Sequence, residues 1–315
     1  MLSSDISDLV GQLKERGARR VVLQFPEGLK RMAPATARAL KEAGFEVLVN
    51  GDPCYGACDL ATDTLEEGDV LVHAGHAPVD VRKNVIFLPY AMDFDVAILD
   101  AALPFIDGKT TGLVTTVQHA HIVPAMEEYL RRRGITVKVA DGSGRTPLRG
   151  QVLGCSFSAA RVPGAEVILY VGTGLFHPIG IALATKAVVV ALDPFAGTVQ
   201  EVSSERLLRR RFAAIERAKN AETIGILVST KSGQNRLALA RRLATLSERA
   251  VIVTAREVSP DELVNLGFSC YVNTACPRLA YDDQVRFPVP VISPQEFEIL
   301  CGVRNWDNYE IDEIP

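Results

Sequence analysis

Cysteines with small neighbours occur in three well-separated loops of this sequence, at Cys58, Cys155 and Cys276. Each follows a glycine or an alanine, which lets a bulky inorganic cluster approach and leaves backbone N–H groups for its sulfides. Three thiolates on a four-iron cluster leave one iron open, and an open iron is where a substrate can bind and react. One thiolate from each of these loops could therefore hold a shared metal cluster.

The sequence around the other three cysteines indicates different roles for them. Cys270 and Cys301 stand in apolar surroundings, which is typical of core thiols. Cys54 shares a loop with Cys58 and is compatible with a ligand, a spare thiol or a packing residue. The long separations between the candidate ligands match no compact zinc or ferredoxin motif. Structural cysteines are therefore the alternative, unless the fold repeats and brings the loops together.

Histidines near the expected strand ends add candidate binding groups. His73, His76, His119, His121 and His177 are compatible with ligands, substrate contacts or ordinary hydrogen-bonded residues, and His177 before Pro178 has the character of a structural residue.

Two polar loops and one arginine could bind an anion. The turn Gly172-Thr173-Gly174 lacks a full G-x-G-x-x-G, and Thr230–Gln234 lacks the P-loop order, yet both stand where an anion can meet a helix N-terminus. Arg278 could clamp a carboxylate beside Cys276. Its alternative is a surface ion pair with Asp282 or Asp283.

Short apolar strands alternate with helices and must position these loops. Runs that are apolar on both faces suit a parallel sheet covered by helices, so we expect an α/β fold. The expected helices include Ala35–Glu42, Pro124–Arg133 and Asn235–Leu246. The expected strands are Arg20–Gln24, Glu46–Asn50, Asp69–His73, Asn84–Leu88, Thr111–Thr115, Ile135–Ala140, Glu166–Val171, Ala187–Leu192, Thr223–Ser229, Arg249–Thr254, Ser269–Asn273 and Val289–Ser293.

The same order of elements recurs about every 100 residues, which is a domain-sized repeat. We expect three similar αβ domains, each a mainly parallel sheet flanked by helices, arranged around a common centre. Their expected limits are 1–104 with Cys58, 105–205 with Cys155 and 206–315 with Cys276. Ligands gather at the carboxyl ends of strands in such sheets, so the three loops can meet at that centre.

Bulk properties exclude several classes of protein. The 315 residues carry a formal net charge of -4, which disfavours a broad basic surface for nucleic acid. The basic run at 206–211 is expected to form a solvated helix face. No signal peptide and no membrane span are visible, so we expect a cytoplasmic protein whose cysteines do not form disulfides.

Four motifs carry a resemblance to a known family. They are Gly51-Asp52 followed by Tyr55-Gly56-Ala57-Cys58, the Gly154-Cys155 loop, Ser229-Thr230-Lys231-Ser232-Gly233-Gln234, and Cys276-Pro277-Arg278. In this order and spacing they resemble the archaeal diphthamide-synthesis enzymes, the 2-(3-amino-3-carboxypropyl)histidine synthases. The resemblance covers nearly the whole chain. These are non-standard radical S-adenosylmethionine enzymes, and the single short loop with three cysteines that ordinary radical enzymes share is absent here.

The resemblance implies a complete reaction. Three αβ domains each give one cysteine to a [4Fe–4S] cluster, and the unique iron holds S-adenosylmethionine. The reduced cluster cleaves the sulfur–Cγ bond, and a 3-amino-3-carboxypropyl radical adds to an imidazole carbon of a histidine on translation elongation factor 2. Methylthioadenosine is the by-product of this first step of diphthamide biosynthesis. The implied partners are that elongation factor, an electron donor and a second copy of the chain, with no membrane and no direct nucleic acid.

On this sequence, the resemblance makes Cys58, Cys155 and Cys276 the metal ligands and gives Cys54 no role. We expect Arg278 and Gln234 to seat the methionine carboxylate and Gly172 and Gly174 to lie near the nucleoside; no catalytic side chain is assigned. The alternative reading is a three-domain [4Fe–4S] dehydratase of the quinolinate-synthase kind. A third interpretation is a non-enzymatic binding protein with hinged αβ domains and incidental cysteines.

Overall fold

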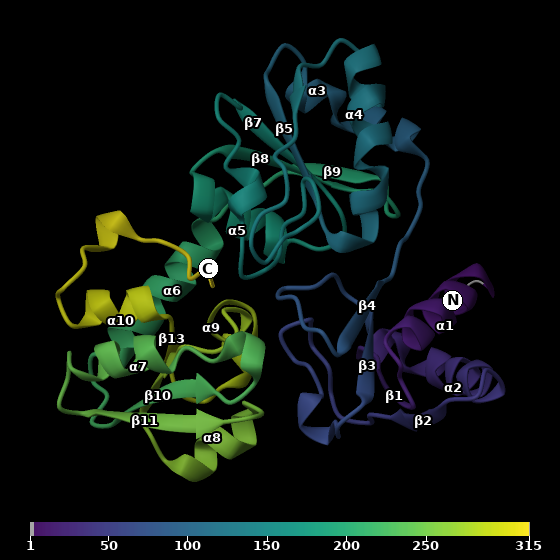
Figure 1. Cartoon of the computed structure of the whole chain (residues 1–315). Coiled ribbons are helices and arrows are strands. Elements are labelled where there is room, and N and C mark those ends of the chain that lie inside the picture. Colours follow the sequence, from purple (N-terminus) through teal and green to yellow (C-terminus); the bar gives the residue numbers. More distant parts are fainter. Residues whose placement is uncertain (1–2, 315) are drawn as a thin grey trace. The chain divides into compact units, whose positions relative to one another are not determined.

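The computed structural model describes residues 3–314 and contains three helix-flanked β-sheets (Figure 1). The chain forms two compact units, of which the first ends at Ala91 and the second begins at Met92. The first unit holds one sheet and the second holds two. Among residues 3–314, no helix combines the length and the apolar character that a bilayer-spanning helix needs. The expected α/β fold with three mainly parallel sheets is confirmed.

The first unit contains a four-stranded parallel sheet in the order β2-β1-β3-β4. Its two α-helices cover one face of the sheet through buried leucines such as Leu9, Leu13 and Leu40 (Figure 1). The central strand β3 is buried at every position, as expected for a strand covered on both faces. The elements are α1 (Ser3–Glu15), β1 (Arg20–Gln24), α2 (Ala33–Glu42), β2 (Glu46–Val49), β3 (Asp69–Gly75) and β4 (Val85–Pro89).

The second unit begins with a five-stranded sheet in the order β6-β5-β7-β8-β9. Four strands are parallel, and the last runs antiparallel to its neighbour. The elements are α3 (Leu103–Ile106), β5 (Thr111–Thr115), α4 (Val123–Arg132), β6 (Val137–Lys138), β7 (Val167–Val171), α5 (Phe176–Thr185), β8 (Val188–Asp193) and β9 (Thr198–Glu201).

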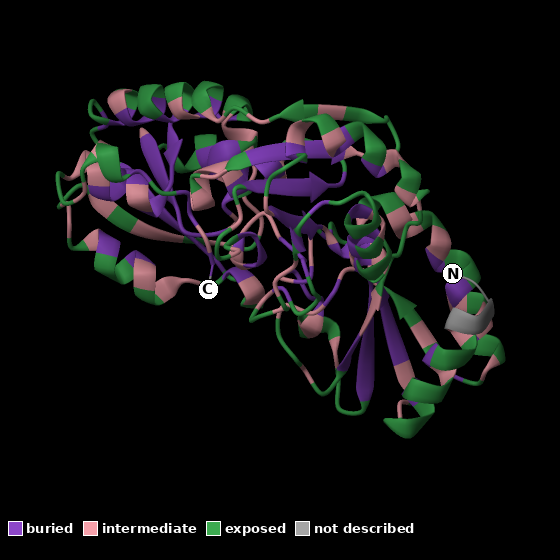
Figure 2. Ribbon diagram, turned by 90° about the horizontal axis from the view of Figure 1, so that it is seen from above, coloured by how far each residue is buried: buried purple, intermediate pink, exposed green. Residues whose placement is uncertain are grey.

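The third sheet has the order β11-β10-β12-β13 and is wholly parallel. The first and third sheets therefore share one strand order, which confirms the expected repeat. The elements are α6 (Glu205–Ala218), β10 (Ile224–Ser229), α7 (Leu237–Ala244), β11 (Ala250–Ala255), α8 (Pro260–Leu266), β12 (Cys270–Asn273), α9 (Arg278–Tyr281), β13 (Val291–Ile292) and α10 (Pro294–Leu300). Figure 2 shows that the central strands are the most buried parts of the chain.

The first expected domain limit, after residue 104, differs from the division between the units. Residue 104 lies inside α3, and Ile106 at the end of this helix packs in the core of the second sheet with Leu99 and Ala102. This segment therefore belongs with the sheet that follows it. The limit between residues 205 and 206 stays a prediction; it falls at the start of α6, whose Leu207 packs on the second sheet and whose Ala214 packs on the third.

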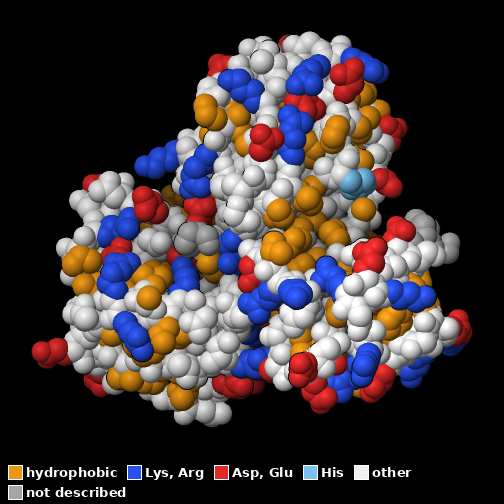
Figure 3. Space-filling model, in the orientation of Figure 1, with side chains coloured by type: hydrophobic (Ala, Val, Ile, Leu, Met, Phe, Trp, Pro, Cys, Tyr) orange, Lys and Arg blue, Asp and Glu red, His pale blue; other side chains and the backbone are white. Residues whose placement is uncertain are grey.

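The basic run at 206–211 is only partly a solvated helix face. Arg206, Arg209 and Arg210 are exposed, but Arg211 is 1% exposed, so the expectation was wrong for this residue. The helical period places Arg211 on the buried face of α6 together with Leu207. Elsewhere, charges of both signs are interspersed over the visible surface (Figure 3), in keeping with the small net charge.

Candidate functional site

The Cys58 loop lies in the first unit, between β2 and β3, as expected. The Sγ atom of Cys58 lies 3.4 Å from the place that a Cβ on Gly56 would take, so glycine leaves space beside the thiol. Gln24, at the end of β1, holds this loop through hydrogen bonds to its backbone. Its Nε2 donates to the carbonyl of Asp59 at 2.8 Å, and its Oε1 accepts from the N–H of Ala61 at 3.2 Å. The carboxyl edge of the sheet therefore positions this partly exposed cysteine.

The Cys155 loop lies in the second unit, between β6 and β7. A tight turn forms there, because the N–H of Leu153 donates to the carbonyl of Ser156 at 2.9 Å. A Cβ on Gly154 would lie 2.5 Å from the ring of Phe176, closer than real contacts allow. Glycine before Cys155 therefore admits the aromatic ring that begins α5.

The Cys276 loop follows β12, the third strand in its block, and is held by Asn273. The side-chain amide of Asn273 donates to the carbonyl of Cys276 at 2.8 Å, and its oxygen accepts from the N–H of Ala275 at 3.0 Å. The guanidinium of Arg278 lies over the ring of Phe176, 4.9 Å from its centroid. Since the same ring contacts Gly154, Phe176 connects the loops of Cys155 and Cys276 within the second unit.

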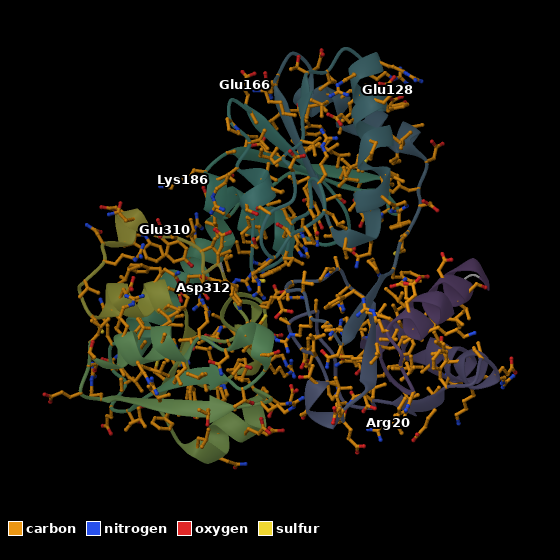
Figure 4. All side chains as sticks on the ribbon, in the orientation of Figure 1. Arg20, Glu128, Glu166, Lys186, Glu310 and Asp312 are labelled. Atoms are coloured by element: carbon orange, nitrogen blue, oxygen red, sulfur yellow. The ribbon has the colours of Figure 1, made fainter. Side chains whose placement is uncertain are left out.

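The C-terminal segment 311–314, here called the C-terminal strap, bonds to both of these loops. The N–H of Ile314 donates to the carbonyl of Cys155 at 2.8 Å. The carboxylate of Asp312 (labelled in Figure 4) accepts from Arg236 at 2.9 and 2.6 Å. Arg236 in turn donates to the carbonyls of Thr274 at 2.7 Å and Ala275 at 3.2 Å. One network of charged and backbone groups therefore fixes the Cys155 loop and the residues directly before Cys276.

Two cavities are lined in part by residues that contact these loops. One of about 590 Å³ is lined by Gly174, Phe176, His177, Arg206, Arg210 and Arg278. The other, of about 520 Å³, is lined by residues that include Arg145, Gln234, Gln295 and the strap residue Ile314. Both are large enough for an organic ligand of ordinary size. The first has three arginines and one carboxylate, Asp282, on its wall, a positive excess that suits an anionic group.

The residues predicted to bind a cofactor do not all line the same cavity. Gly174 and Arg278 line the first cavity, whereas Gln234 lines the second. Gly172 is buried at the end of β7, where the Tyr170 hydroxyl stands 2.7 Å from the place of an added Cβ. Arg278 also forms the expected ion pair with Asp282, at 2.7 Å, with its side chain 55% exposed. These four assignments stay predictions.

His177 lines the first cavity, whereas the sequence predicted a structural role for it. Burial and the positive charge of Arg278 lower the pKa of His177 to about 4, so its imidazole is neutral at neutral pH. Its ring stacks on Tyr170, with centroids 6.0 Å apart. The position of His177 directly after the Gly172–Gly174 turn, at the start of a helix, is the signal that could have assigned it to a cavity.

The donor set fits an iron–sulfur cluster. Each of the three sheets has a partly exposed cysteine in a loop beyond its strands, and Gly56 leaves space beside the Cys58 thiol. Thiolates are the usual ligands of such clusters. Cys54 and Cys270 are instead buried, and Cys301, which is also partly exposed, packs against the core of the third sheet. Cys155 and Cys276 share the second unit, and Cys58 belongs to the first.

Comparisons with known proteins point to one family. The family described as "Putative diphthamide synthesis protein" matches residues 25–311. The chain is 39% identical to the 2-(3-amino-3-carboxypropyl)histidine synthase of Pyrococcus horikoshii, covering 98% of this chain and 92% of the relative. It is 32% identical to subunit 1 of that synthase from Aspergillus fumigatus, covering 99% and 74%. The crystal structure of Dph2 from Pyrococcus horikoshii with a 4Fe-4S cluster matches with a TM-score of 0.92 at 38% identity, covering 98% and 93%.

Proposed function

The chain belongs to the diphthamide synthesis family, and on this premise we propose that it transfers the 3-amino-3-carboxypropyl group of S-adenosylmethionine to a histidine of translation elongation factor 2. The observation that carries the proposal is the nearly full-length similarity to Dph2, which was solved with a 4Fe-4S cluster, in a chain that keeps one loop cysteine beyond each of its three sheets. The transfer is the first step of diphthamide biosynthesis.

Cys58, Cys155 and Cys276 would hold the [4Fe–4S] cluster of this enzyme. When bound and reduced, the cluster supplies the electron that breaks the sulfur–Cγ bond of S-adenosylmethionine, which leaves methylthioadenosine and a 3-amino-3-carboxypropyl radical. The protein selects the bond by holding the co-substrate in one pose. The loops that fix Cys155 and Cys276 are tied together by Phe176 and the C-terminal strap, and this rigidity supports a single pose.

The cavity that contains Arg278 is our candidate seat for S-adenosylmethionine. Three arginines favour the carboxylate of the methionine part, and the glycine turn at Gly174 leaves room for the nucleoside. Because the imidazole of His177 is neutral, it adds no positive charge against the sulfonium. Gln234, in the second cavity, stays the second candidate for the carboxylate.

Replacing Arg278 with alanine is expected to weaken the binding of S-adenosylmethionine by roughly ten- to a hundredfold, as the loss of a hydrogen bond to a charged group costs about 1.5–3 kcal/mol. Equilibrium binding to the anaerobic, cluster-loaded protein measures this change. Asp282→Ala is the control, because it removes the ion-pair partner and keeps the guanidinium. Equal affinity in Arg278→Ala and the unmodified protein would remove Arg278 from the site.

The partners follow from the same proposal. The protein substrate is translation elongation factor 2, the reductant is an external electron donor, and the reaction takes place in the cytoplasm. We propose a homodimer; the name of the fungal relative, subunit 1, supports assembly into a complex. Light scattering of the purified chain would measure its mass in solution.

Product analysis tests the reaction against the dehydratase alternative, which the comparisons do not favour. The chain is purified without oxygen, analysed for iron and sulfide, reduced with dithionite in the presence of S-adenosylmethionine, and its products are separated by chromatography. We expect about four irons per chain and methylthioadenosine. A full cluster without methylthioadenosine would contradict the transferase and favour the dehydratase. No cluster at all would favour a binding protein.

A further inference from the structure

Cys54, His73 and His76 form a compact group in the first unit that includes none of the three proposed cluster ligands. The Cys54 sulfur and one ring nitrogen of each histidine all lie within 4.8 Å of one another. Cys54 and His73 are 3% and 0% exposed, and His76 is partly buried. Thiolate sulfur and imidazole nitrogen are the ligands that zinc prefers in proteins.

The backbone at Gly75 brings the two histidines together. Side chains three residues apart on a strand point to opposite faces of a sheet. Here β3 ends at Gly75, whose φ of +90° turns the chain, and the nearest ring nitrogens of His73 and His76 come to 2.9 Å. A Cβ on Gly75 would also lie 2.9 Å from the side chain of Pro26. Both observations require glycine at this position.

The hydrogen bonds around His73 direct its lone pair into the group. The amide of Gln24 is oriented by two backbone groups: its Nε2 donates to Asp59, and its Oε1 accepts from Ala61. This Oε1 lies 2.9 Å from Nδ1 of His73, so Nδ1 must carry the proton and donate. The lone pair is then on Nε2, which accepts from the Nδ1–H of His76 at 2.9 Å. A bound ion would take the place of this hydrogen bond, with the proton of His76 moved to its Nε2. Metal-bound histidines typically donate their other ring N–H to an oxygen in this way.

The group is shielded from solvent, since His73 is 0% exposed and His76 is partly buried. The ring of Phe87, 5.5 Å from His73 between centroids, covers the group on one side.

We propose that Cys54, His73 and His76 bind one Zn²⁺ ion. A tetrahedral ion with Zn–N bonds of about 2.0–2.1 Å holds its nitrogens about 3.3 Å apart, so the two rings need to separate by only a few tenths of an ångström. Binding converts the Cys54 thiol to a zinc thiolate and releases its proton to solvent. Three protein ligands leave the fourth position to water. The inference does not depend on the proposed reaction.

The bound zinc would brace the loop that carries Cys58. His73 hydrogen-bonds to Gln24, and Gln24 holds the backbone of Asp59, the residue after Cys58. Cys54 belongs to the same loop. A zinc ion would therefore link Cys54 in this loop to His73 in β3, which itself hydrogen-bonds to Gln24 of β1. It would also give Cys54 the role that the family resemblance leaves open.

Metal analysis of the full-length chain tests the site. The chain is purified without oxygen, loaded with iron and sulfide, incubated with Zn²⁺ and desalted, and zinc and iron are measured by mass spectrometry. We expect about one zinc per chain. Cys54→Ser and His76→Gln should each lower the retained zinc at least tenfold and leave the circular dichroism spectrum unchanged, and any loss of iron should be equal in the two variants, because both lose the ion that supports the Cys58 loop. Cys301→Ser, at a thiol of the second unit, is the matched control and should retain zinc.

X-ray absorption at the zinc edge identifies the ligands in the presence of iron. The proposal predicts one sulfur and two imidazole nitrogens. A wild-type protein without zinc, or zinc that persists in both variants, would overturn it. Loss of iron on Cys54→Ser but not on His76→Gln would also overturn it, because Cys54 would then belong to the cluster. Failure to form methylthioadenosine would affect only the proposed reaction and not this site.

Discussion

Replacing Arg211 with alanine is expected to lower the free energy of unfolding by about 3–5 kcal/mol, because the change leaves the carboxylate of Glu296 buried without its partner. Arg211 and Glu296 are 1% and 0% exposed. The guanidinium donates to both carboxylate oxygens, at 2.8 and 2.6 Å, and to the carbonyl of Val291 at 2.8 Å. Burial disfavours its charge, yet Glu296 more than compensates, so the pKa of Arg211 lies above its usual value.

Urea unfolding followed by tryptophan fluorescence measures this effect. The chain has one tryptophan, Trp306, whose ring contacts Tyr309 at 4.8 Å between centroids, and the Tyr309 hydroxyl donates to Glu296. The signal therefore reports on this core. Arg209→Ala is the matched control, since Arg209 pairs with Glu205 on the exposed face of the same helix and should change stability little. Equal losses in the two variants would show that the buried pair adds nothing.

Replacing Arg236 with alanine is expected to remove most of the bound iron while all three cluster cysteines remain. The change leaves Asp312, which is 1% exposed, without its arginine and takes donors from the carbonyls of Thr274 and Ala275. The strap and the start of the Cys276 loop then lose their connection, and the strap also holds Cys155. A ligand set that is no longer fixed binds its metal less well.

Iron per chain after anaerobic reconstitution measures the loss for Arg236→Ala. Arg304→Ala is the control, because Arg304 bonds to Glu298 and Glu310 but to neither cysteine loop. Urea unfolding of both variants separates a local effect on the loops from general instability. Wild-type iron content in a folded Arg236→Ala variant would show that the strap does not position the ligands.

The sheets could be predicted closely because each central strand is a continuous apolar run. The strands at Arg20–Gln24 and Thr111–Thr115 begin and end where the sequence predicts. The antiparallel strand Thr198–Glu201 was missed, because it is a short edge strand with little buried surface and no apolar run. Its register depends on pairing with β8 and not on its own residues.

The sequence identifies which residues belong to the site, but it does not show which of them contact one another. The cysteine loops are visible because small residues and a repeat surround them. The strap bonds groups that are far apart in the sequence, such as Cys155 and Ile314, and no local pattern encodes such a bond. In the sequence, Arg211 has the pattern of an exposed charge, and only the fold shows that Glu296 lies beside it. The group of Cys54, His73 and His76 requires the turn at Gly75.

The transfer itself is the most direct test of the central claim. The anaerobic chain is incubated with dithionite, S-adenosylmethionine and translation elongation factor 2, and the factor is digested and sequenced by mass spectrometry. We predict one histidine that carries a 3-amino-3-carboxypropyl group, with methylthioadenosine formed in equal amount, and neither product with Cys58→Ser, Cys155→Ser or Cys276→Ser. An unmodified factor beside a fully loaded cluster, or modification that survives all three cysteine substitutions, would contradict the account.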